Sequence, residues 1–485
     1  MDRKISHLQP TVVWSFFEDI CQVPRPSKRE DKIIAFMRKF AAEHQFDCKV
    51  DDAGNVLITK EASAGYEDAP VVILQSHLDM VGEKNSDVIH DFYSDPIKPY
   101  IDWEWVKAKG TTLGADCGIG MAASMAVLTD PNIKHGPLEC LFTVDEETGL
   151  SGAFALKPGF LSGKILLNLD SEDEGELFIG CAGGIDTLAT FNYNKNEIPK
   201  GYFPVEIKVS GLLGGHSGDD IHKGRGNAIK ILVRFIWEAY HQYGIRIAVI
   251  EGGNLRNAIA REAFAVILIQ NGYKENLVAD FNVFVHDLKN ELAISEPHLK
   301  LELGSTDKPE FVLDEKSAIS LLNALYGCPH GVFSMSFKMP GMVETSSNLA
   351  AVRFINENEI LVTTSQRSDQ ESGKKNIASM VTAVFEMAGA KVQQTDGYPG
   401  WTPNSDSPVV EIAVREYEKL FGEKPIVRSI HAGLECGLFL EKYPDLDMVS
   451  FGPTIKGAHS PDERINIATV QKFWDHLVEV LRNLQ

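Results

Sequence analysis

Short apolar runs alternate with helical patterns in the N-terminal third of this chain. Four runs typical of buried strands occupy residues 56–59, 71–75, 138–144 and 164–169. A segment of small residues, GIGMAASMAVL (118–128), predicts a helix between the second and third runs. Continuous apolar strands separated by helices are typical of parallel sheets covered on both faces. We therefore expect an α/β domain with a mostly parallel mixed sheet flanked by helices.

A helix near the N-terminus is predicted by apolar residues at helical spacing in IIAFMRKFAAE (33–43). The preceding Ser27-x-x-Glu30 has the spacing of a capping box, in which two side chains accept hydrogen bonds from unpaired N–H groups at the helix start. We therefore expect Ser27 and Glu30 to cap this helix.

The pattern changes from about residue 187. Strands and helices follow in the order β-α-β-β-α-β over residues 205–303, which is the ferredoxin-like arrangement. Residues 314–396 add a helix, two adjacent strands, a helix and a strand, which resembles an incomplete copy of the same unit. The middle of the chain is therefore predicted to be a doubled ferredoxin-like α+β unit.

A connector rich in Gly, Pro and Ser, GYPGWTPNSDSP (397–408), precedes a return of the α/β pattern. This order predicts a lid domain inserted into a catalytic domain whose two parts are separated in the sequence. The predicted boundaries are 1–186 and 397–485 for the catalytic domain and 187–396 for the lid.

The chain has 485 residues and a formal charge of −21. This excess of carboxylates repels phosphate backbones and anionic lipids, so we expect neither nucleic acid nor membrane as a partner. No apolar run approaches the roughly 20 residues that span a bilayer. The first residues also lack the pattern of a signal peptide. We therefore expect a cytoplasmic protein.

Seven cysteines are scattered along the chain without a CxxC pair. An odd number without such spacing argues against a disulfide framework. We interpret most of them as reduced thiols in the core: Cys21, Cys48, Cys117, Cys140, Cys181, Cys328 and Cys436.

Polar motifs stand directly after four predicted strands: SHLD (76–79), DEE (145–147), LD (169–170) and GAHSPDE (457–463). Ligands of open α/β sheets bind beyond the carboxyl ends of the strands, so these motifs are expected to converge. A fifth motif, TLGADCGIG, places Asp116 just before the helix of small residues.

Imidazole and carboxylate side chains brought together suit zinc, cobalt or manganese, and one carboxylate can bridge two ions. Each motif alone has a common alternative, because a single His is usually hydrogen-bonded or exposed and a DEE run is usually a solvated turn. Their joint position at strand ends favours a metal site. The candidate ligands are His77, Asp116, Glu147, Asp170 and His459.

The motifs SHLDMV, GTTLGADCGIG, DEETG, NLDSEDEGE, GGHSG and GPTIKGAHSPDE resemble the dizinc peptidase superfamily that includes carnosinases, peptidase T and bacterial carboxypeptidases. The stretches GCAGGID, EGGNLRNAIAREAF, YPGW and HAGLECGLF look like its cytosolic aminoacyl-histidine dipeptidase branch. The resemblance spans the chain. It implies a zinc-peptidase-like fold and a metallo-dipeptidase that cleaves Xaa-His dipeptides with two Zn²⁺ per chain, for which Co²⁺ or Mn²⁺ could substitute.

The resemblance also implies roles for the ligands. His77, Asp116 and Asp170 would hold one zinc ion, and Asp116, Glu147 and His459 would hold the other, with Asp116 as the bridge. Asp79, two residues after His77, would fix the imidazole ring.

Three further roles follow from the resemblance. Glu146 would be the general base that takes a proton from a metal-bridging water and returns it to the leaving amine. His216 in GGHSG would donate a hydrogen bond to the oxyanion. The lid, about 210 residues long, is roughly twice the size of the small domain of many relatives, so we expect His216 to act within its own chain. A homodimer remains open.

Substrate anchoring is assigned by the same resemblance to Asn257, Arg367 and the backbone amides near Gly433, which would hold the C-terminal carboxylate of the peptide. The planar fork of an arginine matches a carboxylate. Alternatively, Arg367 is only a charge at the rim. His431 either touches the substrate or caps a turn.

Two other functions stay open on this scaffold. An N-acyl amino acid deacylase or desuccinylase would use the same metal ligands and differ in its lid contacts. A zinc-binding relative without activity is disfavoured by Glu146, because such a protein would be expected to lose the base first.

Overall fold

The computed structural model describes residues 3–337, 339–404 and 406–485. It divides into two compact units. The first comprises Met1–Gly180, Trp401–Ser429 and Leu434–Gln485, and the second comprises Cys181–Gly400 and Ile430–Gly433. The boundaries expected from the sequence, at 186/187 and 396/397, lie within six residues of the two main divisions. The short return of Ile430–Gly433 to the second unit has no counterpart in the predicted boundaries.

The first unit is built on an eight-stranded sheet that is parallel at its centre. The adjacent strands β6, β3, β7 and β21 are parallel, whereas β1 with β2, β2 with β6, and β21 with β8 are antiparallel. This confirms the expected mixed α/β sheet. The strand order is β1 (Asp47–Val50), β2 (Val56–Lys60), β6 (Leu138–Thr143), β3 (Val72–His77), β7 (Ile165–Asn168), β21 (Asp447–Ser450), β8 (Glu176–Cys181) and β20 (Ile426–Ile430).

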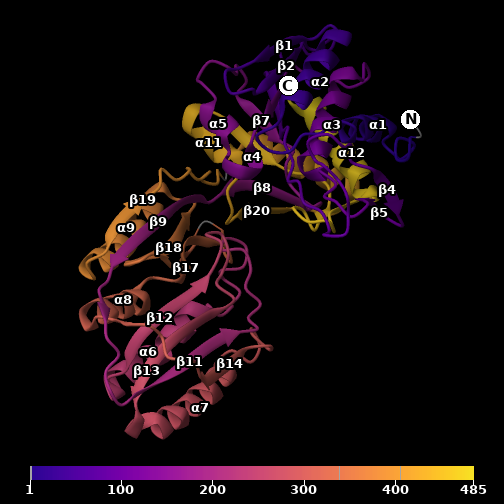
Figure 1. Cartoon of the computed structure of the whole chain (residues 1–485). Helices are drawn as coiled ribbons and strands as arrows, with labels where there is room; N and C mark the ends of the chain where they lie inside the picture. Colours follow the sequence, from indigo (N-terminus) through magenta and orange to yellow (C-terminus); the bar gives the residue numbers. More distant parts are fainter. Residues whose placement is uncertain (1–2, 338, 405) are drawn as a thin grey trace. The chain divides into compact units, whose positions relative to one another are not determined.

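Helices flank this sheet (Figure 1). The small residues of α3 are buried almost throughout, since Gly and Ala allow α1 and β3 to pack closely against it. The helices are α1 (Thr11–Cys21), α2 (Asp31–Glu43), α3 (Ala115–Thr129), α4 (Glu146–Gly149), α5 (Ser151–Ala155), α10 (Pro408–Phe421), α11 (Glu435–Lys442) and α12 (Ile467–Asn483). A separate sheet joins β22 (Ile455–Lys456), β23 (Arg464–Asn466), β5 (Trp105–Ala108) and β4 (Pro99–Asp102).

The predicted capping box before α2 is wrong. The Ser27 hydroxyl donates instead to Oδ2 of Asp79 at 2.7 Å. Oε1 of Glu30 accepts the backbone N–H groups of Lys28 and Asp145 at 2.8 and 3.1 Å. Both side chains therefore support the loops at the strand ends rather than their own helix.

The second unit contains two ferredoxin-like copies in one sheet. The first copy is β11 (Tyr202–Ser210), α6 (Ala228–Tyr243), β12 (Arg246–Gly253), β13 (Ala263–Gln270), α7 (Lys274–Glu291) and β14 (Lys300–Ser305). Its strand order, β14-β11-β13-β12, is that of the ferredoxin-like fold.

The second copy has the same order, β19-β9-β18-β17, and joins the first through β12 and β17. The doubled unit is therefore confirmed. The sequence pattern missed the first strand of this copy because it precedes the whole of the other copy. The elements are β9 (Gly183–Asn192), α8 (Glu315–Gly327), β17 (Val343–Asn356), β18 (Glu359–Ser368), α9 (Glu371–Met387) and β19 (Lys391–Gln394), with β16 (Gly331–Met335) beside β17 and a small pair, β10 (Lys195–Asn196) with β15 (Val312–Leu313).

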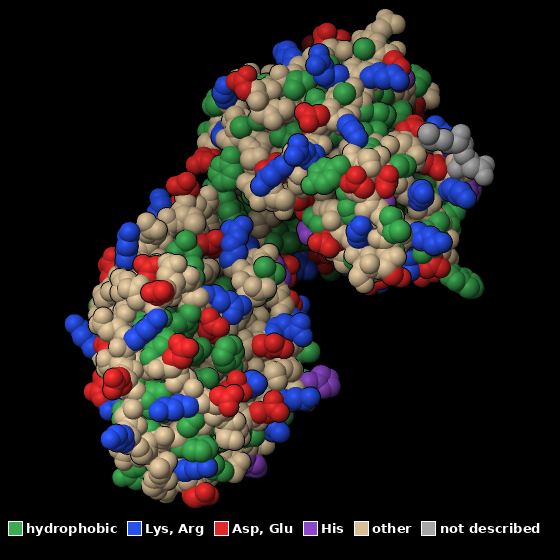
Figure 2. All heavy atoms as spheres, in the orientation of Figure 1, with side chains coloured by type: hydrophobic (Ala, Val, Ile, Leu, Met, Phe, Trp, Pro, Cys, Tyr) green, Lys and Arg blue, Asp and Glu red, His purple; other side chains and the backbone are tan. Residues whose placement is uncertain are grey.

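The surface carries charges of both signs. Figure 2 shows acidic and basic side chains interspersed over the visible face, with hydrophobic side chains between them. Within the described ranges, no helix is long and apolar enough to cross a membrane.

Candidate metal centre

The carboxyl ends of the central strands bring the candidate ligands together. His77 is the last residue of β3, and Asp170 follows β7 by two residues. After β6, Asp145 takes a left-handed conformation (φ 53°), which turns the chain into α4 with Glu147 in its first turn. Asp116 lies at the start of α3, before the backbone becomes helical.

Asp116 faces two imidazole rings with its two oxygens. Nε2 of His77 lies 3.1 Å from Oδ1 of Asp116 and 3.3 Å from Oδ1 of Asp170. Nε2 of His459 lies 3.0 Å from Oδ2 of Asp116 and 2.8 Å from Oε2 of Glu147. The five side chains thus form two groups that share Asp116.

This donor set fits divalent cations. An imidazole Nε2 carries at most one hydrogen, yet in each group it faces two carboxylate oxygens. Among the described residues, Oε1 of Glu147 and Oδ1 of Asp170 are buried and have no hydrogen-bond partner. A buried carboxylate oxygen without a partner is costly. A cation between the donors of each group would satisfy them, and mixed nitrogen and oxygen donors suit zinc and its neighbours.

The electrostatics of the cluster point the same way. Hydrogen bonding and charge from Asp116 and Glu147 raise the pKa of His459 to about 11. Burial opposes a charge on His77, but Asp170 and Asp116 outweigh it and raise the pKa of that ring well above its ordinary value. Burial raises the pKa of Glu147 and of Asp170. Burial therefore disfavours the ionised form of both carboxylates. Two metal ions would supply the positive charge that stabilises this form.

Asp79 is buried and joins the two sides of the centre. Its Oδ1 lies 3.3 Å from Nδ1 of His77 and accepts the N–H of Glu146 at 3.0 Å. Its Oδ2 accepts the N–H of Glu147 at 3.2 Å and the hydroxyl of Ser27. One carboxylate therefore orients the ring of His77 and fixes the turn that carries the next two acidic residues.

Glu463 holds the loop of Asp116, and sequence reasoning did not single it out. Its carboxylate accepts the N–H groups of residues 113–115 at 2.7, 2.9 and 2.7 Å and faces that of Asp116 at 3.4 Å. The available signal was its place in GAHSPDE, four residues after His459. Glu463 thus links the bridging carboxylate to the loop of the second histidine.

Glu146 lies beside the ligands. Oxygen atoms of Glu146 and Glu147 and a ring nitrogen of His77 all lie within 4.8 Å of one another. Burial raises the pKa of Glu146 well above its ordinary range, and the charges of Asp170 and Glu147 add to this. The side chain therefore lies next to the cluster, where burial favours its protonated form.

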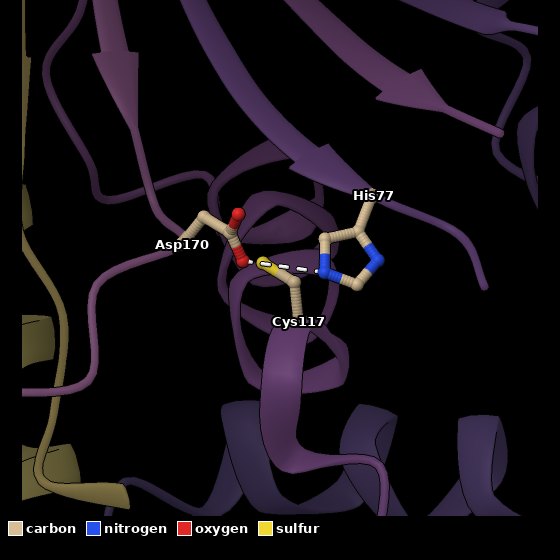
Figure 3. A group of neighbouring side chains, drawn as sticks. All are labelled: His77, Cys117 and Asp170. Atoms are coloured by element: carbon tan, nitrogen blue, oxygen red, sulfur yellow. Dashed lines mark ion pairs between the residues drawn. The ribbon is translucent and has the colours of Figure 1, made fainter. Parts of the chain in front are cut away.

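Cys117 also reaches this centre. Its sulfur lies within 4.8 Å of ligand atoms of His77 and Asp170, and Figure 3 shows the three side chains pointing toward one another. The thiol donates to the carbonyl of Leu169 at 3.4 Å. Cys117 is buried, as a core thiol would be, but its neighbours are the candidate metal ligands rather than apolar side chains alone.

A second polar cluster lies in the second unit. Arg367 donates to the hydroxyl of Tyr398 at 3.0 Å, and its other terminal nitrogen lies 3.5 Å from Nε2 of His216. Nε2 of His431 lies 2.8 Å from the hydroxyl of Ser346. Burial, together with the charge of Arg367, lowers the pKa of His431 to about 3, so that ring is neutral.

One donor in this cluster is free to bind an anion. Arg367 is 6% exposed, and among the described residues its Nε has no hydrogen-bond partner. Nδ1 of His216 accepts the N–H groups of Gly218 and Asp219 at 3.3 and 3.4 Å. Nδ1 also lies 3.5 Å from Oδ2 of Asp219, so both ring nitrogens of His216 face polar groups.

Asn257 and Gly433 belong to the same unit. The carbonyl of Asn257 accepts the N–H of Ser217 at 2.8 Å, which places this exposed residue next to the loop of His216. A side chain at Gly433 would lie 2.8 Å from the ring of Tyr398, so only glycine fits there. Sequence reasoning noted Tyr398 only as part of YPGW and not as a partner of Arg367.

Comparisons with known proteins place this chain in a family. The model of peptidase family M20/M25/M40 matches residues 73–483. The chain is 45% identical to the cytosol non-specific dipeptidase of Escherichia coli (strain K12) over 481 residues, 99% of each protein. The crystal structure of aminoacylhistidine dipeptidase from Vibrio alginolyticus matches with a TM-score of 0.91 and 46% identity, over 100% of this chain and 99% of that one.

A more distant structure shares the fold alone. Aminopeptidase PepT from Bacillus cereus matches with a TM-score of 0.58 and 18% identity, over 98% of this chain and 99% of that one. The family expected from the motifs is confirmed by these matches. The chain belongs to peptidase family M20/M25/M40 and, like the dipeptidases that it matches, is a hydrolase acting on peptide bonds.

Proposed function

We propose that this peptidase is a dizinc dipeptidase whose substrates include Xaa-His dipeptides. The observation that carries the proposal is the pair of donor groups that share Asp116, each with an imidazole nitrogen and carboxylate oxygens. Both similar proteins are named as dipeptidases; one name specifies histidine, and the other calls the enzyme non-specific. The name of the Escherichia coli relative also supports a setting in the cytosol.

In this proposal His77, Asp116 and Asp170 hold one zinc ion, and Asp116, Glu147 and His459 hold the other. When bound, the two ions would lower the pKa of a water molecule and polarise the carbonyl of the peptide bond. Asp79 keeps the ring of His77 in the orientation that points Nε2 at the ion.

Glu146 moves the proton. Its carboxylate accepts a proton from the attacking water as the new carbon–oxygen bond forms. It then delivers this proton to the amide nitrogen as the carbon–nitrogen bond breaks. Its backbone is fixed by Asp79, and burial favours the protonated form between the two steps. One side chain can therefore serve both halves of the reaction.

The second cluster would recognise the substrate. Arg367 offers its unpaired Nε–H to the C-terminal carboxylate of the dipeptide. His216 is proposed to donate a hydrogen bond to the developing oxyanion, on the strength of the family resemblance. Asn257, His431 and the backbone near Gly433 are proposed as further contacts, on the strength of the family resemblance. The neutral ring of His431 would add no charge to this site.

Hydrolysis of a small substrate panel tests the proposal. The panel contains β-Ala-His, Gly-His, Ala-Ala, a tripeptide and an N-acetyl amino acid, each tested with zinc-loaded protein, chelator-treated protein and Glu146→Gln. Glu139→Gln is the matched control, since Glu139 is also a glutamate of this unit but accepts hydrogen bonds from the loop of Ser162 and Gly163.

We expect zinc-loaded protein to cleave the dipeptides. The Glu146→Gln variant should lose this activity, and the Glu139→Gln variant should retain it. Cleavage of the N-acetyl compound alone would replace the proposal with a deacylase. Two bound zinc ions without cleavage of any substrate would replace it with a metal-binding role.

A further inference from the structure

A layer of polar side chains crosses the centre of the catalytic sheet, where apolar residues are the rule. Gln75, Thr143, Asn168 and Ser450 lie on the four parallel strands and are each 0% exposed. Glu435, the first residue of α11, is 1% exposed and belongs to the same layer. A polar layer this deep is costly unless its members bond one another.

The hydrogen bonds run from strand to strand in the order of the sheet. Thr143 on β6 and Gln75 on β3 both donate to Oε2 of Glu435, at 2.7 and 2.6 Å. The side-chain amide of Asn168 on β7 donates to Oε1 of Gln75, and the hydroxyl of Ser450 on β21 donates to Oδ1 of Asn168. Glu435 is therefore the acceptor on which the chain of bonds ends.

Three of these polar residues lie two or three positions before a residue of the metal centre. Gln75 precedes His77 by two residues, so the two side chains lie on one face of β3. Asn168 precedes Asp170 by two residues. Thr143 ends β6, three residues before Glu146. A bond between two members of the layer thus fixes the spacing of two ligand-bearing strand ends.

The other oxygen of Glu435 has no hydrogen-bond partner among the described residues, although it is buried. A side chain kept only for packing would not need this carboxylate, because an apolar residue would fill the space without leaving an oxygen unpaired. The unpaired oxygen thus carries a cost to stability, next to the candidate metal ligands. Glu435 has no part in the reaction proposed above.

We propose that Glu435 is a positioning residue of the metal centre, which sets the spacing of β3 and β6 so that His77 and Glu147 meet the same pair of ions. This inference rests on the zinc sites of the proposed function. It adds a residue that contacts neither ion nor substrate and acts through Gln75 and Thr143.

Zinc affinity tests the inference without any substrate. The variants are Glu435→Ala, Glu435→Gln and Thr143→Val, and Glu139→Ala is the control for loss of a buried carboxylate that accepts hydrogen bonds elsewhere on β6. Zinc binding to metal-stripped protein is titrated by calorimetry, at a temperature where circular dichroism shows each variant folded. Outer residues that orient metal ligands typically contribute ten- to a hundredfold to affinity.

We expect Glu435→Ala to weaken zinc binding about ten- to a hundredfold, Thr143→Val to weaken it several-fold, and Glu435→Gln, which keeps an acceptor oxygen, to restore most of it. Glu139→Ala should bind zinc as the parent protein does. Equal affinities for Glu435→Ala and Glu139→Ala would overturn the inference. If Glu435→Ala does not fold, parent-like affinity of Thr143→Val would overturn it.

The proposed function fails by a different result, because the parent protein itself would then bind no zinc, or would bind it without hydrolysing any peptide.

Discussion

Asp79→Asn should weaken zinc binding while leaving the fold intact. Each oxygen of Asp79 serves two donors: Oδ1 faces His77 and the N–H of Glu146, and Oδ2 accepts from Ser27 and the N–H of Glu147. An asparagine has the same size but only one acceptor oxygen. However its amide is turned, the NH₂ group faces one of these two pairs of donors.

The expected loss follows from the role of such partners. Residues that orient a ligating imidazole typically contribute ten- to a hundredfold to metal affinity. This corresponds to about 1.4–2.7 kcal/mol of binding free energy. We expect weaker binding of the zinc ion held by His77. We also expect lower activity, because the same substitution loosens the turn that carries Glu146.

Calorimetric titration of zinc into metal-stripped protein measures this loss, with Gly-His hydrolysis as the second readout. Asp51→Asn is the control, because Asp51 also accepts several backbone N–H groups but does so in the turn between β1 and β2. Parent-like zinc affinity in Asp79→Asn would refute the reasoning that a single carboxylate organises both sides of the centre.

Three further outcomes are expected. Glu146→Gln should lower kcat for Gly-His by about 10²–10⁴-fold and leave zinc affinity unchanged. Weaker zinc binding in a calorimetric titration would instead indicate that Glu146 is a metal ligand. Arg367→Met should raise KM roughly 10–100-fold for Gly-His but not for its C-terminal amide; an equal rise for both would remove the carboxylate role. His476, buried against the carbonyl of Ala413, has its pKa lowered to about 4 by burial, so stability present above about pH 6.5 is lost as pH falls toward 4. In urea unfolding of metal-free protein, the free energy of unfolding should fall by about 2 kcal/mol more in the parent than in His476→Gln between pH 8 and pH 5. An equal fall in both proteins would contradict the lowered pKa of His476.

The sequence was sufficient to predict the parts of the fold that depend on local pattern. Apolar runs identified the central strands β3, β6 and β7, and motifs directly after them predicted where His77 and Asp170 would lie. The strand order of the first ferredoxin-like copy followed from its contiguous pattern. Strand β9 was missed as a member of the second copy, because residues 193–314 separate it from the next element of that copy.

Long-range hydrogen bonds were beyond the reach of local pattern. Ser27 and Glu30 have the spacing of a capping box, but the strand-end loops recruit both side chains. Glu463 and Glu435 are parts of recognised motifs, yet their partners are hundreds of residues away in sequence. A single polar residue in an apolar strand, such as Gln75, was the signal that could have indicated the buried layer.

The most direct test of the two-ion centre bridged by Asp116 is the rate of β-Ala-His or Gly-His hydrolysis as zinc is titrated into chelator-stripped protein, for the parent chain and for Asp116→Asn. We expect no activity without metal, a maximum near two equivalents of zinc per chain, and no recovery at any zinc level in Asp116→Asn. Full activity of the stripped protein, or recovery of Asp116→Asn with parent-like zinc dependence, would contradict it.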